Sequence, residues 1–93
     1  MIPGDLFVLP ADYETLTAVA EQESLWVLAD AAQSFGARRA GVTVGRHAPR
    51  TTTSFYPAKP LAAMGDAGAI ILRDGGDMGA LLRSLRVHGE GRD

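Results

Sequence analysis

The stretch LWVLADAAQSFGA, residues 25–37, decides the fold class of this chain. Its first five residues, Leu25 to Ala29, form an apolar run with the length of a fully buried β-strand. The run ends at Asp30. Because open α/β folds bind their ligands at the carboxyl ends of their strands, we expect Asp30 to lie at a ligand-binding edge of a sheet.

The segments before this strand complete a strand–helix–strand pattern. Leu6–Leu9 form a second short apolar run, which ends at Pro10. Between the two runs, apolar residues recur at helical spacing, and they are Tyr13, Leu16, Val19 and Ala20. Asp12 and Glu14 precede and open this helix, where acidic side chains are favourable. The order of elements predicts an α/β fold with a mostly parallel sheet and flanking helices.

The segments after Asp30 supply a loop, two strands and a last helix. Residues 38–50 mix glycine, arginine and proline without periodicity, which predicts a surface loop. TTTSFY, residues 51–56, is typical of a strand, and AGAIIL, residues 67–72, predicts another buried strand. Asp74 is the expected cap of the last helix, and His88 and Gly89 are its expected stop. Its apolar face consists of Met78, Leu81, Leu82 and Leu85.

The composition argues against several classes of function. At 93 residues and 46% hydrophobic content, the chain is one small domain or part of a larger one. A net charge of -2 gives no basic face for a phosphate backbone, so nucleic acid is not an expected partner. No metal site is expected, because there is no cysteine and we interpret His47 and His88 as structural or solvated. The absence of a long apolar run and of a signal-peptide pattern predicts a cytoplasmic protein without a membrane partner.

Lys59 is the only lysine, and the other eight basic side chains are arginine. It lies between Pro57 and Pro60 in a largely apolar stretch, with no acidic residue within six positions. A guanidinium stays protonated at any usable pH, whereas an amine beside apolar side chains can lose its proton and attack a carbonyl. Lys59 is therefore a candidate nucleophile. A solvated surface amine is the alternative, and it is the commoner role of a lysine.

Three further residues are candidates for a ligand site. Asp30 could pair with a cationic group of a ligand, or it could cap a helix. Gln33 would face the same side as Asp30 if residues 31–33 are helical. Ser54 could donate to a phosphate oxygen, or it could be an ordinary hydroxyl at the end of a strand.

Several strings of the sequence resemble a known family. VLADAAQSFGA at 27–37, TTTSFYPAKPLAAMGDAGAIIL at 51–72 and LLRSLRVHGEG at 81–91 are similar to the central segment of DegT-type sugar aminotransferases. DLFVLPADY, residues 5–13, resembles the strand and helix that begin this segment. These are pyridoxal-phosphate enzymes of fold type I that make amino sugars on nucleotide carriers. The resemblance covers nearly the whole chain and keeps the order and spacing of the motifs.

The resemblance implies a role for each candidate residue. Asp30 would hold the pyridine nitrogen of pyridoxal 5′-phosphate protonated, and Gln33 would lie near the phenolic oxygen of the ring. Ser54 would bind the phosphate of the cofactor. Lys59 would form the Schiff base and then shuttle a proton between cofactor and substrate carbons. Because related sugar 3-dehydratases have histidine in place of this lysine, Lys59 favours transamination over dehydration.

The resemblance also implies a domain organisation and a function. We expect residues 1–93 to be a fragment of the cofactor-binding large domain, lacking the N-terminal part of that domain and the C-terminal small domain. The parent enzyme would be a homodimer that aminates a nucleotide-linked ketosugar, with glutamate as the expected amino donor. The fragment alone would have little or no activity. The alternative is a non-catalytic remnant or a small α/β interaction module without turnover.

Overall fold

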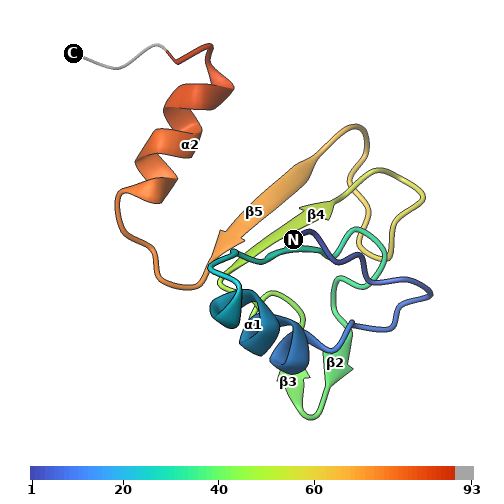
Figure 1. The fold of residues 1–93 in the computed structure, drawn as a ribbon. Helices are drawn as coiled ribbons and strands as arrows, with labels where there is room; N and C mark the ends of the chain where they lie inside the picture. The colour runs from blue at the N-terminus through green and yellow to red at the C-terminus, as the bar shows by residue number, and fades with distance from the viewer. Residues whose placement is uncertain (90–93) are drawn as a thin grey trace.

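The computed structural model describes residues 1–89 and shows helices, a three-stranded sheet and a two-stranded hairpin (Figure 1). The helices are α1 (Tyr13–Gln22) and α2 (Met78–Arg86). The strands are β1 (Leu28–Asp30), β2 (Arg38–Arg39), β3 (Val42–Thr43), β4 (Arg50–Ser54) and β5 (Gly68–Leu72). The predicted α/β class with flanking helices is confirmed.

The three-stranded sheet has the order β1-β4-β5. Strand β1 pairs in parallel with β4, in a register that places Asp30 opposite Thr52. Strand β5 pairs antiparallel with β4, with Gly68 opposite Ser54. The sheet is therefore mixed, with one parallel and one antiparallel pair of strands.

The two helices lie against different faces of the sheet. Ala29 of β1 belongs to a buried cluster with Tyr13 and Ala20 of α1. Leu28 is adjacent to Ala29 and so points to the other face, where it lines a groove with Leu82 of α2. No described residue of α2 is buried. The apolar core of the described chain therefore sits between β1 and α1.

The expected first strand, Leu6–Leu9, is not a strand. Residues 1–5 run beside β1 instead, because Leu28 N donates to Met1 O at 3.0 Å and Asp30 N donates to Pro3 O at 2.9 Å. The apolar run that follows is an exposed turn in which Phe7 and Val8 have φ values of 54° and 63°. Such left-handed backbone cannot continue a β-ladder, so the prediction placed the pairing segment several residues too late.

Residues 38–50 contain a hairpin that the loop prediction missed. Strands β2 and β3 pair through Arg38 and Thr43, and the turn between them has Ala40 and Gly41 at φ values of 49° and 78°. Two successive residues with positive φ are typical of a tight hairpin turn that matches the twist of its strands. The rest of the segment is turn and bend up to β4.

The last strand and helix also differ in detail from the prediction. Strand β5 is not fully buried, since Ile70 is 52% exposed. The N-cap of α2 is Asp77 and not Asp74. Gly75 and Gly76 stand between them at φ values of 34° and 61°, which prevents a helix from starting at Asp74. The predicted stop is confirmed, because His88 has a φ of 59° and Gly89 N bonds back to Ser84 O.

A buried carboxylate lies beside the core. Asp5 is 2% exposed, and its Oδ1 accepts hydrogen bonds from Tyr13 Oη at 2.6 Å and from Ala11 N at 2.9 Å. Its Oδ2 accepts from Ser34 Oγ at 2.5 Å. Burial, and next the hydrogen bond to Asp5, raise the pKa of the Tyr13 phenol. Asp5 thus joins the N-terminal segment, α1 and the turn after β1.

The length and hydropathy of the two helices do not match those of a membrane-spanning helix. Within residues 1–89, neither α1 nor α2 combines the length and the apolar character that crossing a bilayer would need.

Gly68 is expected to be intolerant of a side chain. A Cβ atom added there would lie 2.9 Å from Thr53 O, closer than carbon and oxygen normally approach. We expect Gly68→Ala to lower the free energy of unfolding by about 1–3 kcal/mol, measured by urea denaturation. Gly4→Ala is the matched control, since an added Cβ meets nothing within 4 Å and its effect should stay within about 0.5 kcal/mol. Equal losses in the two variants would contradict the steric argument.

Asp12 should make α1 sensitive to acid. Its Oδ1 accepts from Thr15 N at 3.2 Å, and this backbone hydrogen bond lowers the pKa of Asp12 below the ordinary value of 3.8. The stabilisation is present above that ordinary value and is lost as the pH falls through the lowered pKa. Asp12→Asn keeps a capping side chain without a charge. We expect the free energy of unfolding of this variant to fall less than that of the wild type as the pH is lowered from about 5 to 2. Coinciding urea-unfolding curves of both proteins across this range would refute the assignment.

Candidate functional site

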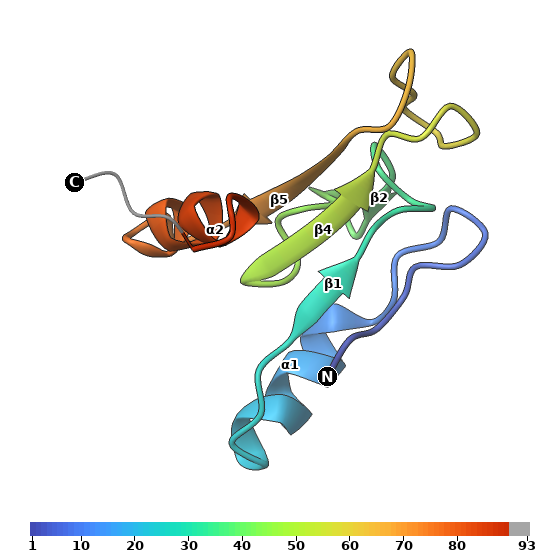
Figure 2. The ribbon, with the colours of Figure 1, turned by 90° about the horizontal axis from the view of Figure 1, so that it is seen from above.

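Strands β1 and β4 carry two of the candidate residues to one edge of the sheet. Asp30 is the last residue of β1, and Ser54 is the last residue of β4. Because the strands are parallel, both end on the same side, and Ala31 N still donates to Thr52 O at 2.8 Å beyond the end of β1. Figure 2 shows the chain leaving β1 and β4 in the same direction. The predicted position of Asp30 at a carboxyl edge is confirmed.

Asp30 has a fixed backbone and an available carboxylate. Its carbonyl oxygen accepts from Asp5 N at 3.0 Å, and its side-chain Oδ1 accepts from Ala32 N at 3.1 Å. The side chain is exposed, and no other hydrogen bond or ion pair engages it within residues 1–89. One carboxylate oxygen therefore remains available to a cationic group.

The segment after Asp30 is a series of turns and not a helix. Ser34 N donates to Ala31 O at 3.1 Å, and Ala37 N donates to Ser34 O at 2.8 Å. Asp30 therefore caps a turn, and the helical condition under which Gln33 would face the same side is not met. Gln33 is exposed on this turn, three residues from Asp30.

Ser54 is half-buried at the end of β4. Its Oγ accepts from Tyr56 N at 3.2 Å. Because that contact uses a lone pair of the hydroxyl oxygen, the O–H group itself remains able to donate. The serine can therefore offer a hydrogen bond to an oxygen of a ligand at this edge.

Lys59 lies in the loop between β4 and β5. Phe55 N donates to Ala67 O at 2.8 Å, Ala63 N donates to Phe55 O at 2.7 Å, and Lys59 N donates to Tyr56 O at 2.9 Å. Lys59 is half-buried, and among the described residues it forms no ion pair. These backbone hydrogen bonds shape the loop while leaving the amine unpaired.

The apolar surroundings predicted for Lys59 are only partly formed. Met64 is fully exposed, and Tyr56 and Leu61 are about half exposed, at 53% and 52%. Phe55 is the one aromatic of the stretch that packs inward, edge to face against Phe35 with ring centroids 5.4 Å apart. This contact joins the loop of Lys59 to the turn that follows Asp30.

The chemistry of these groups fits pyridoxal phosphate. Its pyridine nitrogen suits a carboxylate, and its phenolic oxygen suits an amide. Its phosphate suits a hydroxyl donor, and its aldehyde carbon suits an unpaired primary amine. In the part of the chain that the structure describes, no three side chains of histidine, aspartate or glutamate gather to hold a metal ion. His47 Nε2 lies 3.0 Å from Val42 O, and its ring stacks on Tyr13, as expected of a structural histidine.

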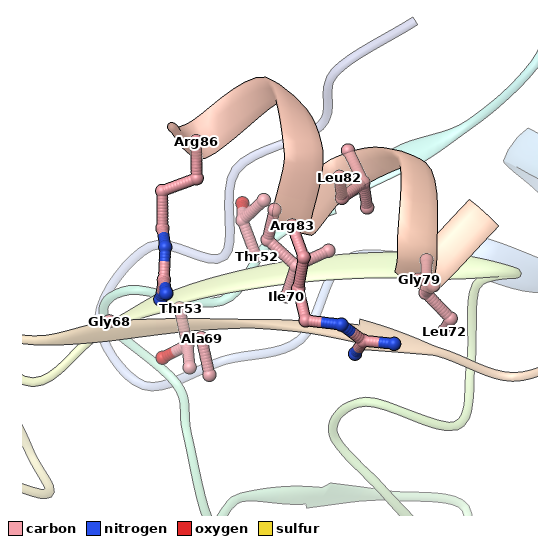
Figure 3. Close-up of a pocket in the computed structure, with 10 residues that line it drawn as sticks. All are labelled: Thr52, Thr53, Gly68, Ala69, Ile70, Leu72, Gly79, Leu82, Arg83 and Arg86. Atoms are coloured by element: carbon pink, nitrogen blue, oxygen red, sulfur yellow. The ribbon is translucent and has the colours of Figure 1, made fainter. Parts of the chain in front are cut away.

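One hollow of the described chain lies away from these four residues. A cavity of about 680 Å³ separates α2 from β4 and β5, with Arg83 and Arg86 reaching over the strands (Figure 3). None of Asp30, Gln33, Ser54 or Lys59 lines it. The four candidate residues therefore lie outside this hollow.

The hydrogen-bonded group formed by Asp5, Tyr13 and Ser34 was not predicted from the sequence. Asp5 and Ser34 are 29 residues apart, and no periodicity relates them. The available signal was weak: an aspartate within the N-terminal apolar segment, and a serine between the apolar residues of the AAQSFGA string.

Comparison with solved structures defines the class. An aminotransferase from Brucella abortus has the same fold with a TM-score of 0.91 and 46% identity, covering 99% of this chain and 24% of that one. The chain thus has the fold of pyridoxal-phosphate-dependent aminotransferases of fold type I. The model of the DegT/DnrJ/EryC1/StrS aminotransferase family matches residues 1–93, and the chain belongs to this family. Members of the family depend on pyridoxal phosphate.

Two curated relatives are similar to nearly the whole chain. The Pleiotropic regulatory protein of Geobacillus stearothermophilus is 42% identical over 89 residues, which are 96% of this chain and 24% of the relative. The UDP-2-acetamido-2-deoxy-3-oxo-D-glucuronate aminotransferase of Pseudomonas aeruginosa is 37% identical over 92 residues, which are 99% of this chain and 25% of the relative. The chain spans about a quarter of the length of these relatives.

The contact between Phe35 and Phe55 should couple the two segments of the site. We expect the single variants Phe35→Leu and Phe55→Leu, together with the double variant, to give a coupling free energy of about 0.5–1.5 kcal/mol, because edge-to-face aromatic pairs contribute this much beyond buried area. Urea unfolding of the four proteins measures it. Strictly additive losses of unfolding free energy would show that the turn after Asp30 and the loop of Lys59 are not coupled through this contact.

Proposed function

We propose that residues 1–93 form part of the cofactor-binding large domain of an aminotransferase that adds an amino group to a nucleotide-linked ketosugar. The observation that carries this proposal is the placement of Asp30 and Ser54 at one edge of a parallel strand pair, with the loop of Lys59 joined to it through Phe35 and Phe55. The family membership supports the same reaction class.

The substrate class rests on the relatives. The Pseudomonas aeruginosa protein is named for a UDP-linked sugar that carries a 3-oxo group, which is a nucleotide-linked ketosugar. By this likeness, the acceptor is a ketosugar on a nucleotide carrier and the donor is an amino acid, with glutamate as our expectation. We further propose a homodimeric enzyme in the cytoplasm.

Each residue has a stated task in this proposal. Pyridoxal phosphate, when bound, supplies an aldehyde carbon and an aromatic ring that withdraws electrons from the bond being broken. The Asp30 carboxylate holds a proton at the pyridine nitrogen, and Gln33 orients the ring by its phenolic oxygen. Ser54 Oγ donates to a phosphate oxygen. Lys59 Nζ attaches the cofactor and afterwards carries a proton to and from the reacting carbons.

The exposure of these groups bears on the affinity. Asp30 and Gln33 are exposed, and Ser54 and Lys59 are half-buried. Hydrogen bonds and charge pairs open to water contribute less than enclosed ones. We therefore expect residues 1–93 alone to bind the cofactor weakly and to show little or no turnover.

The chain offers a sharp chemical test of Lys59. It has two primary amines, Lys59 Nζ and the N-terminus, whose Met1 N donates to Trp26 O at 2.9 Å. With pyridoxal phosphate added, we expect an absorbance band at about 400–430 nm, a range set by the chemistry of the cofactor with amines. Borohydride reduction followed by peptide mass spectrometry should place the adduct on Lys59.

Lys59→Arg is the matched control, because it keeps the positive charge and removes the nucleophilic amine. In a chain with a blocked N-terminus, this variant should lose both the band and the adduct. An adduct found on the N-terminus alone, or a band that persists in Lys59→Arg, would overturn the assignment of Lys59 and favour an interaction module without turnover.

A further inference from the structure

Asp5 is a buried acceptor with no described cation beside it. Neither ion pair of the described residues includes Asp5, since these join Arg39 to Asp12 and Arg73 to Asp74. Its two oxygens instead accept from three donors, all at 2.9 Å or less. A carboxylate in this setting needs every one of its donors, because each lost donor leaves an oxygen desolvated without compensation.

The contacts of Asp5 fall on both ends of the segment from Asp30 to Ser34. Its backbone N donates to Asp30 O at 3.0 Å, and its Oδ2 accepts from Ser34 Oγ at 2.5 Å. Ser34 is completely buried, so its hydroxyl cannot exchange this partner for water. One residue therefore fixes the start and the end of the turn that carries Asp30 and Gln33.

The geometry of this turn decides where the Asp30 carboxylate points. Ala32 N donates to Asp30 Oδ1 at 3.1 Å, so the direction of that N–H group sets one oxygen of the side chain. Ala32 lies inside the segment that Asp5 holds at both ends. A change in the Ser34 contact can therefore reach the Asp30 side chain through two or three residues of backbone.

We propose that Asp5 is a positioning residue: through Ser34 it fixes the turn that carries Gln33 and that aims the Asp30 carboxylate at the cofactor ring. The part that concerns the cofactor rests on the proposed function. The part that concerns the turn rests on the hydrogen bonds alone, so the two can fail separately.

Tyr13 provides a control of the same kind. Its hydroxyl donates to Asp5 Oδ1 at 2.6 Å, about the same length as the Ser34 contact, but it comes from α1 and not from the turn. Ser34→Ala and Tyr13→Phe thus each remove one hydroxyl donor from the same buried carboxylate. A purely structural role predicts similar consequences for both variants, whereas a positioning role predicts a difference confined to the turn.

The first measurement is amide hydrogen exchange of the chain without cofactor. We expect Ser34→Ala to speed exchange at positions 32 and 34 roughly tenfold more than Tyr13→Phe does, which corresponds to one lost hydrogen bond. Amides of β4 serve as the reference for general destabilisation. Equal acceleration in both variants would overturn the proposal. If Ser34→Ala does not fold, Ser34→Cys, which keeps the shape with a weaker donor, replaces it in the same comparison.

The second measurement adds pyridoxal phosphate and follows its absorbance band against pH. We expect Ser34→Ala to shift the midpoint of this pH profile, because the carboxylate at the pyridine nitrogen is displaced, and Tyr13→Phe to leave the midpoint unchanged. An unmoved midpoint with a loosened turn would overturn the role toward the cofactor. If the two variants differ in exchange as expected but the wild-type chain shows no band, the proposed function is refuted and Asp5 remains the residue that holds the turn.

Discussion

The buried carboxylate of Asp5 is the constraint on which the N-terminal half of the molecule depends. Placing a carboxylate at 2% exposure is unfavourable unless donors replace its water. The donors come from the start of α1 and from the turn after β1, namely Ala11, Tyr13 and Ser34. These segments therefore meet at one point. Tyr13 also belongs to the small apolar cluster, whose other members are Ala20, Val27, Ala29 and Ala48, so it links Asp5 to the core.

The parallel pairing of β1 with β4 places the candidate residues at one edge of the sheet. Asp30 stands opposite Thr52, and the hydrogen bond from Ala31 N to Thr52 O extends the pairing past the end of β1. Side-chain hydrogen bonds reinforce the same contact, since Thr52 Oγ1 donates to Ala29 O and Thr53 Oγ1 donates to Ala31 O. Two chain segments leave the sheet side by side as a result, one with a carboxylate and an amide, the other with a hydroxyl and an amine.

The sequence predicted those features that depend on local patterns. The helical spacing from Tyr13 to Ala20 is such a pattern, and the helix is confirmed. The apolar run before Asp30 also forms a strand, but this strand covers only Leu28–Asp30, and Leu25 and Trp26 are 51% and 59% exposed instead of buried. The prediction of a strand at Leu6–Leu9 was wrong. Hydrophobicity indicates that a side chain favours burial, but it does not determine whether the backbone pairs with another strand. The contacts of Asp5 and Ser34 could not be predicted, since they join residues 29 positions apart through side chains alone.

The two halves of the candidate site are held in different ways, and this difference suits their proposed tasks. Asp30 is fixed by backbone hydrogen bonds on both sides and by a buried network behind its turn. Lys59 is held by a few turn hydrogen bonds, two flanking prolines and one aromatic contact of Phe55. A carboxylate that holds a single proton needs a constant direction. An amine that attaches to a carbon, leaves it and carries protons needs room to move, so the looser mounting belongs on Lys59.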